Sequence, residues 1–248
     1  MSKSWQTFDG KMRNLKQHTQ LIDLALTISQ KKCTKIRKCD NSKGSIRLDL
    51  GDKENNHLHL NHPNDVKNVN RIFAFSRSKI NEQVVVEVYR IFTDYMVHIL
   101  REIFASSPKR LLSLASNKDD KQMSFMEILN AGTYDELQDQ MSLKIYRSLE
   151  RQKSTPKLLE KFIRVSGINI NQDLKRKALL FLEIRHLIIH NNSKADEKFT
   201  QMNNEGLVSV NTRNRKITIN FYLVNSAINS VFALCKAIDQ ELERVGLV

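Results

Sequence analysis

Apolar residues recur at helical spacing along most of the chain. Residues 11–31 carry an apolar side with this spacing, and residues 79–106 carry a longer one, built from Ile80, Val84, Val88, Ile91, Tyr95, Ile99 and Ile103. Spacings of three and four place side chains on one face of a helix. The pattern therefore predicts a first helix at 11–31 and a long core helix that ends before Pro108. A further helix is predicted at 65–76, after Asn64 or Asp65 as its cap.

Helix-start signals divide the second half of the chain. Two capping boxes place a hydroxyl three residues before a glutamate, Ser124 before Glu127 and Thr133 before Glu136. In such a box each side chain bonds a backbone N–H that the first helical turn leaves free. Thr155-Pro156 predicts another helix, which stops at Gly167, and others are predicted from about Asn171 and over 222–244.

Alternating apolar and polar residues are confined to two short regions. They lie at IRLDL and HLHL within 40–64, and at 206–221 around a polar turn. Alternation of this kind is typical of a small β-hairpin. Glycine (7) and proline (3) are scarce, which disfavours a many-stranded fold. We expect an all-α bundle of six to eight helices with one or two minor β-hairpins.

The net charge of the chain indicates which class of binding partner to expect. The net charge of +13 and the isoelectric point near 9.7 favour polyanions such as RNA, DNA or an anionic membrane face. A basic surface that only keeps the protein soluble is the alternative. The candidate RNA-binding cations are Lys31, Lys32, Lys35, Arg37 and Lys38, together with Arg147 and Arg151 from a row between Lys144 and Arg164.

Cysteine usage and hydropathy indicate the compartment. Three cysteines form no disulfide framework and fit a reducing cytosol. The first residues lack the apolar core of a secretory signal, and no apolar run approaches the length of a membrane span. We expect a soluble cytoplasmic protein that requires no metal or cofactor. A zinc site from Cys33, Cys39, His57, His59 and His62 is disfavoured, because the spacings do not match common zinc fingers.

The segment ALLFLEIRHLIIH at 178–190 carries the candidate chemistry. It is apolar on most sides, and its polar residues are Glu183, Arg185, His186 and His190. Arg185 falls on an apolar stripe, so its guanidinium must meet a carboxylate, a phosphate or a water-filled interface. Imidazole near a helix C-terminus is favoured in its protonated form. A purely structural role is the alternative, in which His190 caps the helix and Arg185 pairs with a buried glutamate.

The order Arg185-His186-x3-His190-Asn191 resembles the motif of the HEPN superfamily: arginine, a polar residue, three variable positions and histidine, followed in many bacterial members by asparagine. The long helix with VHILREIFASSPKRLL resembles the first core helix of that domain, and MSFMEILNAGTYDELQDQM resembles the capped turns that follow it. The resemblance covers 67–248, which would be a HEPN-like helical domain. Residues 1–66 would be an N-terminal helical extension with a basic loop.

The resemblance implies a metal-independent endoribonuclease. HEPN ribonucleases are typically homodimers in which two motif helices form one cleft, and the RNA 2′-hydroxyl attacks the neighbouring phosphate. Arg185 would stabilise the phosphate and His190 would transfer protons, with His186, Glu183 and Asn191 in support. A toxin or antiviral effector with an antitoxin or defence-system partner is the implied role. The alternatives are a non-catalytic HEPN module that binds RNA or a protein, and a helical scaffold for an acidic partner.

Overall fold

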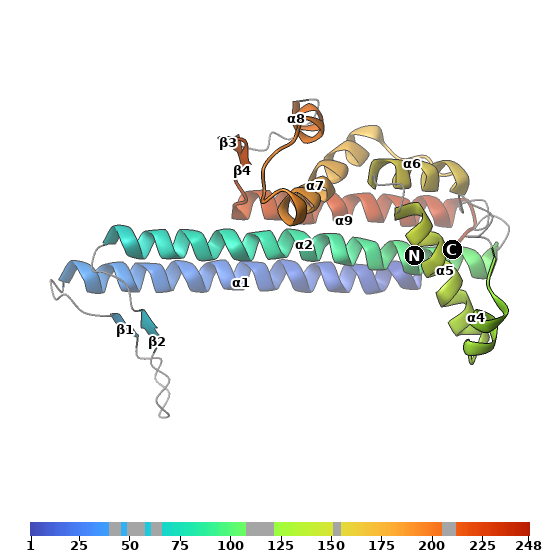
Figure 1. The fold of residues 1–248 in the computed structure, drawn as a ribbon, viewed down its shortest axis with the longest axis horizontal. Coiled ribbons are helices and arrows are strands. Elements are labelled where there is room, and N and C mark those ends of the chain that lie inside the picture. Colours follow the sequence, from blue (N-terminus) through green and yellow to red (C-terminus); the bar gives the residue numbers. More distant parts are fainter. Residues whose placement is uncertain (40–45, 49–57, 61–65, 108–121, 151–154, 205–211) are drawn as a thin grey trace.

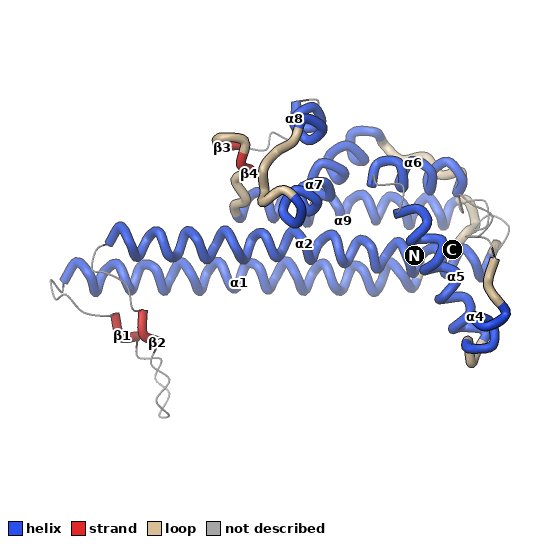
Figure 2. The backbone as a smooth tube through the Cα atoms, in the orientation of Figure 1, coloured by secondary structure: helices blue, strands red, loops and turns tan. Residues whose placement is uncertain are grey.

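The computed structural model describes the chain apart from residues 40–45, 49–57, 61–65, 108–121, 151–154 and 205–211 (Figure 1). Its helices are α1 (Lys3–Cys39), α2 (Val66–Ser106), α4 (Phe125–Asn130), α5 (Tyr134–Glu150), α6 (Thr155–Ser166), α7 (Gln172–His190), α8 (Glu197–Asn204) and α9 (Phe221–Arg244). Its strands are β1 (Ile46–Leu48), β2 (Leu58–Leu60), β3 (Thr212–Arg213) and β4 (Lys216–Ile217). The all-α prediction with minor hairpins is confirmed (Figure 2).

Two long helices, α1 and α2, lie antiparallel along most of the molecule (Figure 1). They contain 37 and 41 residues, or roughly 55 and 62 Å at 1.5 Å per residue. The separate helices predicted at 65–76 and 79–106 are one continuous helix, because no glycine or proline interrupts 66–106. The first helix also extends beyond 11–31 in both directions.

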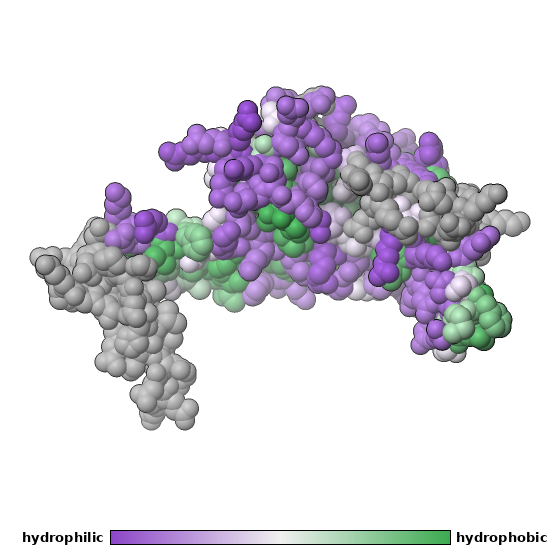
Figure 3. Space-filling model, in the orientation of Figure 1, coloured by the Kyte–Doolittle hydropathy of each residue, from purple (hydrophilic) through white to green (hydrophobic). Residues whose placement is uncertain are grey.

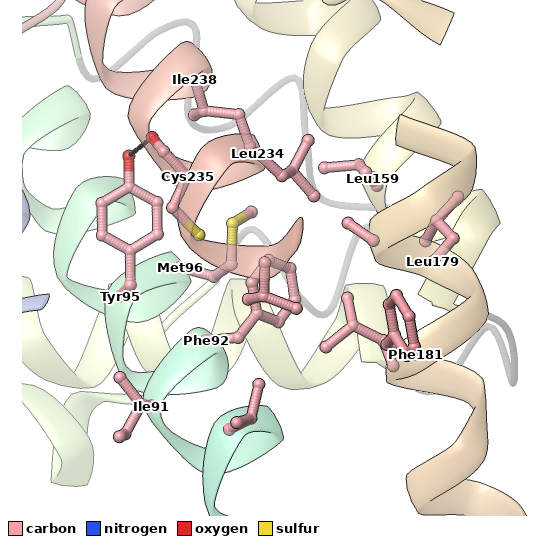
Figure 4. Packing of buried hydrophobic residues seen from close by; sticks show 14 of the residues in the cluster. Ile91, Phe92, Tyr95, Met96, Leu159, Leu179, Phe181, Leu234, Cys235 and Ile238 are labelled. Atoms are coloured by element: carbon pink, nitrogen blue, oxygen red, sulfur yellow. Dashed lines mark hydrogen bonds between the residues drawn. The ribbon is translucent and has the colours of Figure 1, made fainter. Parts of the chain in front are cut away.

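The core lies where the N-terminal part of α1, the C-terminal part of α2, α7 and α9 meet. Figure 4 shows Phe92 and Met96 of α2 packed among side chains of α7 and α9, and the Tyr95 hydroxyl donates to the Cys235 carbonyl at 3.2 Å. Trp5 and Phe8 of α1 belong to the same apolar cluster. The segment before residue 67 thus contributes to the core of the remainder, while the proposed boundary at 66 stays a prediction.

Helix α9 corrects one expectation. By length and composition alone it could cross a membrane, so the expectation that no apolar run approaches that length is wrong. The helix nevertheless lies inside the bundle, packed on α1, α2 and α7, and its buried residues include the charged Asp239. A core helix passes the same test, so this is weak support for a membrane span.

Both predicted hairpins are present. Strands β1 and β2 pair in antiparallel register, Ile46 with Leu60. They lie near the end of α1 and the start of α2, away from α7 and α9 (Figure 1). Strands β3 and β4 pair Thr212 with Ile217, and are shorter than the alternation suggested. Asn214 and Arg215 at this second turn have φ angles of 51° and 62°, which suit the two-residue turn of a twisted hairpin. This hairpin borders the C-terminal end of α7.

Candidate functional site

Helix α7 holds the candidate motif in a largely buried setting. Asn171 caps its start, accepting from the backbone N–H groups of Asp173 and Leu174 at 2.9 and 3.1 Å. The run from Ala178 to Ile184 is buried against α2, α6 and α9. Ile189 near the end is 46% exposed, although the apolar pattern suggested that it faces inward. The last turn therefore emerges from the core, which exposes the end of the motif.

Glu183 is buried and is bound by α8. Only 6% of the residue is exposed, and Lys198 Nζ donates to its Oε1 at 2.5 Å. The sequence predicted a supporting role for Glu183 at the site and left open a buried glutamate as the partner of Arg185. Among the described residues the partner of Glu183 is instead Lys198, which no sequence signal indicated. Glu183 thus anchors α8 to α7.

Arg185 lies against an aromatic ring of α2. Its guanidinium carbon is 4.6 Å from the centre of the Tyr89 ring, within the range of a cation–π contact. Its Nε is buried and finds no hydrogen-bond partner, and among the described residues no carboxylate pairs with it. Because the Nε is closed to solvent, only the Nη N–H groups of the half-buried guanidinium could meet a phosphate oxygen. Tyr89 could not be identified from sequence, since it lies off the main apolar stripe.

His186 and His190 lie side by side on the exposed face of the last turn. Their ring centres are 4.8 Å apart and their planes are inclined by 43°. Both residues are exposed, whereas Glu183, three residues before His186, is buried. Spacings of three and four place these three polar residues on one side of α7, but the structure buries the first and exposes the other two. His190 is paired with His186 and not with Arg185.

The end of α7 is fixed by the chain that follows it. Asn191 is the C-cap, and its side-chain amide donates to the Lys194 carbonyl at 2.7 Å. The left-handed conformation that commonly ends a helix falls on Asn192 and Ser193, with φ angles of 49° and 60°. Ser193 accepts from the Ile217 N–H at 2.9 Å, which ties this turn to the β3–β4 hairpin.

A polar hollow of about 910 Å³ opens beside this cap. It is bordered by α7's cap, α8 and the β3–β4 hairpin, and its lining includes Asn191, Lys194, Glu197, Gln201 and Arg215. The lining mixes cations, carboxyl groups and amides, which suits a polar ligand with several hydrogen-bonding groups. Its lining comes from residues 191–215, but sequence patterns gave no signal for it, because periodicity does not predict how the cap, α8 and the hairpin fold around a hollow.

Arg185 and His190 point in different directions. Five residues on a straight helix separate them by roughly 140° at 100° per residue. Arg185 is half-buried against Tyr89, and His190 lies exposed at the surface. One copy of α7 therefore does not bring the two together.

The expected RNA-binding cations are also apart. Lys31, Lys32 and Lys35 are exposed near the far end of α1, and Arg147 is exposed on α5 at the opposite end (Figure 1). The side chains of Arg37, Lys38 and Arg151 lie outside the described residues. No continuous basic stripe through the site can be traced from the described cations.

The disfavoured zinc site gains no support. Cys33 is buried, whereas the side chains of Cys39, His57, His59 and His62 lie outside the described residues. Within the part of the chain that the structure describes, no group of three or more His, Cys, Asp or Glu side chains could hold a metal ion.

Comparisons with protein-family models, with curated proteins and with solved structures gave no match to this chain. The site must therefore be interpreted from its own residues and from the sequence resemblance.

Proposed function

We propose that this protein is a metal-independent endoribonuclease of the HEPN type, active as a homodimer in the cytoplasm. The observation that carries the proposal is the exposed imidazole pair, His186 and His190, at the end of a helix whose middle is buried and whose Arg185 has no carboxylate partner among the described residues. A buried donor without a hydrogen-bond partner costs stability, so the Nε of Arg185 supports a role outside the fold.

The chemistry follows from the side chains. Cleavage by the 2′-hydroxyl breaks the P–O5′ bond, forms a P–O2′ bond and leaves a 2′,3′-cyclic phosphate and a 5′-hydroxyl. His190 would take the 2′-hydroxyl proton or deliver one to the leaving oxygen, which imidazole can do at neutral pH. His186 would orient His190, being in contact with it. The Arg185 fork would stabilise the non-bridging oxygens.

A second protomer would complete the site. Because Arg185 and His190 diverge on one helix, the proposed cleft combines Arg185 of one chain with His190 of the other. Exposed Ile189 lies between the two histidines in sequence and supplies an apolar contact for such a pairing. A role as a toxin or antiviral effector with a silencing partner is proposed from the resemblance alone.

The test is RNA cleavage in EDTA with product ends mapped. Wild type is expected to leave cyclic phosphates, whereas Arg185→Ala and His190→Ala should lower the rate by at least about 100-fold each, the usual size of acid–base and electrostatic contributions. His98→Ala removes an exposed imidazole from α2 and serves as the matched control. Cleavage that survives both site variants, or that needs a divalent metal, would overturn the assignment.

Mixing the two inactive variants tests the shared cleft. If Arg185 and His190 act across protomers, a mixed dimer retains one intact cleft of two, and activity should return to a fraction of wild type after exchange. If subunit exchange is proven and activity does not return, then either both residues act within one chain or they do not act together at all.

One observation favours a second candidate, a non-catalytic HEPN module that binds RNA. The Arg185 guanidinium lies on the Tyr89 ring with its Nε buried, an arrangement that also suits a fixed structural cation. That candidate predicts salt-dependent RNA binding without cleavage. The same assay with a parallel binding measurement separates the two.

A further inference from the structure

The short helix α4 presents an apolar surface that nothing in the described structure covers. None of its residues is buried, and its large side chains are open to solvent: Phe125 is 74% exposed, Met126 63%, Ile128 46% and Leu129 61%. Tyr134 at the start of α5 adds a ring that is 65% exposed. We call these five residues the knob. Figure 3 shows α4 as a green projection on a mostly purple surface.

Such a knob is unusual for a monomer. Isolated exposed apolar residues are normal, but large apolar side chains gathered on one projection mark a contact surface. The helix is well built, since Ser124 and Glu127 form a complete capping box. Lys144 of α5 also bonds Glu127, at 3.3 Å. The exposure is therefore a property of an ordered element.

Among the described residues the charge around the knob is negative on balance, since four carboxylates lie near it with the two cations Lys144 and Arg101. Residues 122–143 contain Glu127, Asp135, Glu136 and Asp139 and no lysine or arginine, within a chain of net charge +13. Asp135 and Asp139 share Arg101 of α2, at 3.8 and 3.1 Å, and remain 77% and 53% exposed. A partner surface should therefore combine apolar side chains with cations.

The chain itself carries a surface of that kind. Leu21, Leu24 and Ile28 follow one side of α1 at helical spacing and are 65%, 56% and 58% exposed. Lys31, Lys32 and Lys35 continue α1 and are exposed, and residues 24–39 contain no acidic residue. We call these six residues the arm stripe. It lies where α1 and α2 extend beyond the main bundle (Figure 1).

We propose that the knob of one copy docks on the arm stripe of a second copy, and the reverse, in a two-fold dimer. The knob stands at the level of the start of α1, because Asp135 and Gln138 line one hollow with Lys3 and Thr7. The arm stripe begins 18 residues later, roughly 27 Å along the helix. Antiparallel alignment of two α1 helices therefore places each knob at the partner's stripe, and a closed pair satisfies both surfaces.

This contact is independent of the proposed nuclease cleft. Helix α7 lies on the other side of α2 from α1 (Figure 1). A protein that does not cleave RNA could still form the knob contact, and a protein without the knob contact could still cleave RNA. The arm lysines would then serve protein association, and would not be free for RNA in the dimer.

Sedimentation equilibrium over a concentration series, up to about 100 µM, tests the contact. The knob variant is Phe125→Ser with Leu129→Ser, and the arm variant is Leu24→Ser with Ile28→Ser. Each should weaken one association step at least tenfold, and high salt should weaken it as well. Tyr222→Ser removes an equally exposed ring from α9 and should change nothing. Far-UV circular dichroism checks that every variant remains folded.

An equimolar mixture of the two variants is the decisive experiment. A mixed dimer retains one intact contact, formed by the knob of the arm variant and the stripe of the knob variant, so association should recover in the mixture. If association is weakened in the knob variant but not in the arm variant, the arm stripe is not the partner surface of the knob. An unchanged mass in both variants, or a mixture that associates no better than its components, also overturns the proposal.

Discussion

The pair between Glu183 and Lys198 provides the sharpest stability prediction. Lys198→Ala removes the partner of a carboxylate whose side chain is only 7% exposed, while the lysine side chain itself is 47% exposed. Exposed ion pairs contribute about 0.2–1 kcal/mol, whereas removing one partner of a buried pair costs about 3–5 kcal/mol. Because water reaches the lysine but hardly the carboxylate, we expect the free energy of unfolding to fall by about 1–2 kcal/mol.

Chemical denaturation and calorimetry measure this cost. A loss of that size corresponds to a decrease in Tm of about 2–8 °C for a chain of this length. Lys236→Ala removes an exposed lysine of α9 that has no ion pair among the described residues, and should stay within about 0.5 kcal/mol of wild type. Replacing the buried partner, Glu183→Gln, should cost less than Lys198→Ala, because it removes the charge that needs compensation. A Lys198→Ala protein as stable as the control would refute the reasoning.

Three further predictions concern single residues. Gly10→Ala should stabilise the protein by about 0.5–1 kcal/mol in denaturant titrations, because a Cβ at this helical position meets nothing within 4 Å. Gly167→Ala should destabilise it, because the φ angle of 69° at Gly167 is unfavourable for a residue with a Cβ. Asn171→Ala should cost about 1 kcal/mol in the same titrations, because it removes the cap of α7; no change would exclude the cap as a stabilising contact. Burial raises the pKa of Asp239 despite hydrogen bonds from Ser2, so the folded state holds this proton more tightly. Stability from this group should be full below the unfolded pKa of about 3.9 and decline as pH rises through the folded value, and Asp239→Asn should remove that slope in pH-dependent denaturation.

The elements of the fold could largely be predicted from the chain. Helical spacing placed the core residues of α2 and α9, and cap chemistry placed the starts of α4, α6 and α7. The second capping box was half right: Thr133 accepts from the Glu136 N–H, but Glu136 bonds the Gly132 N–H in place of that of Thr133. Local sequence signals do not predict which of two neighbouring backbone N–H groups a side chain will bond.

The environment of the motif could not be predicted in the same way. Glu183, His186 and His190 share one side of a helix by spacing, yet α8 covers the first and leaves the other two exposed. The knob was likewise identified only as a capped helix, since apolar residues on an amphipathic pattern are expected to face inward. What covers a given face of a helix is decided by how the other elements pack on it, and the periodicity of that helix alone does not predict this packing.

The burial of α7 bears directly on how its motif can act. Arg185 and His190 are separated by roughly 140° around one helix axis, so only an unwinding or a bend of the helix between them could bring them together within one chain. Unwinding this turn would break the hydrogen bond from the Asn191 N–H to the Leu187 carbonyl and withdraw the buried Leu187 from the core, at about 1.5–3 kcal/mol for that side chain alone. The hydrogen bond from the Ile217 N–H to the Ser193 carbonyl holds the same end of the helix in place. We therefore expect Arg185 and His190 to act together across two chains, and activity in a strict monomer would leave His186 and His190 as the site and exclude Arg185 from it.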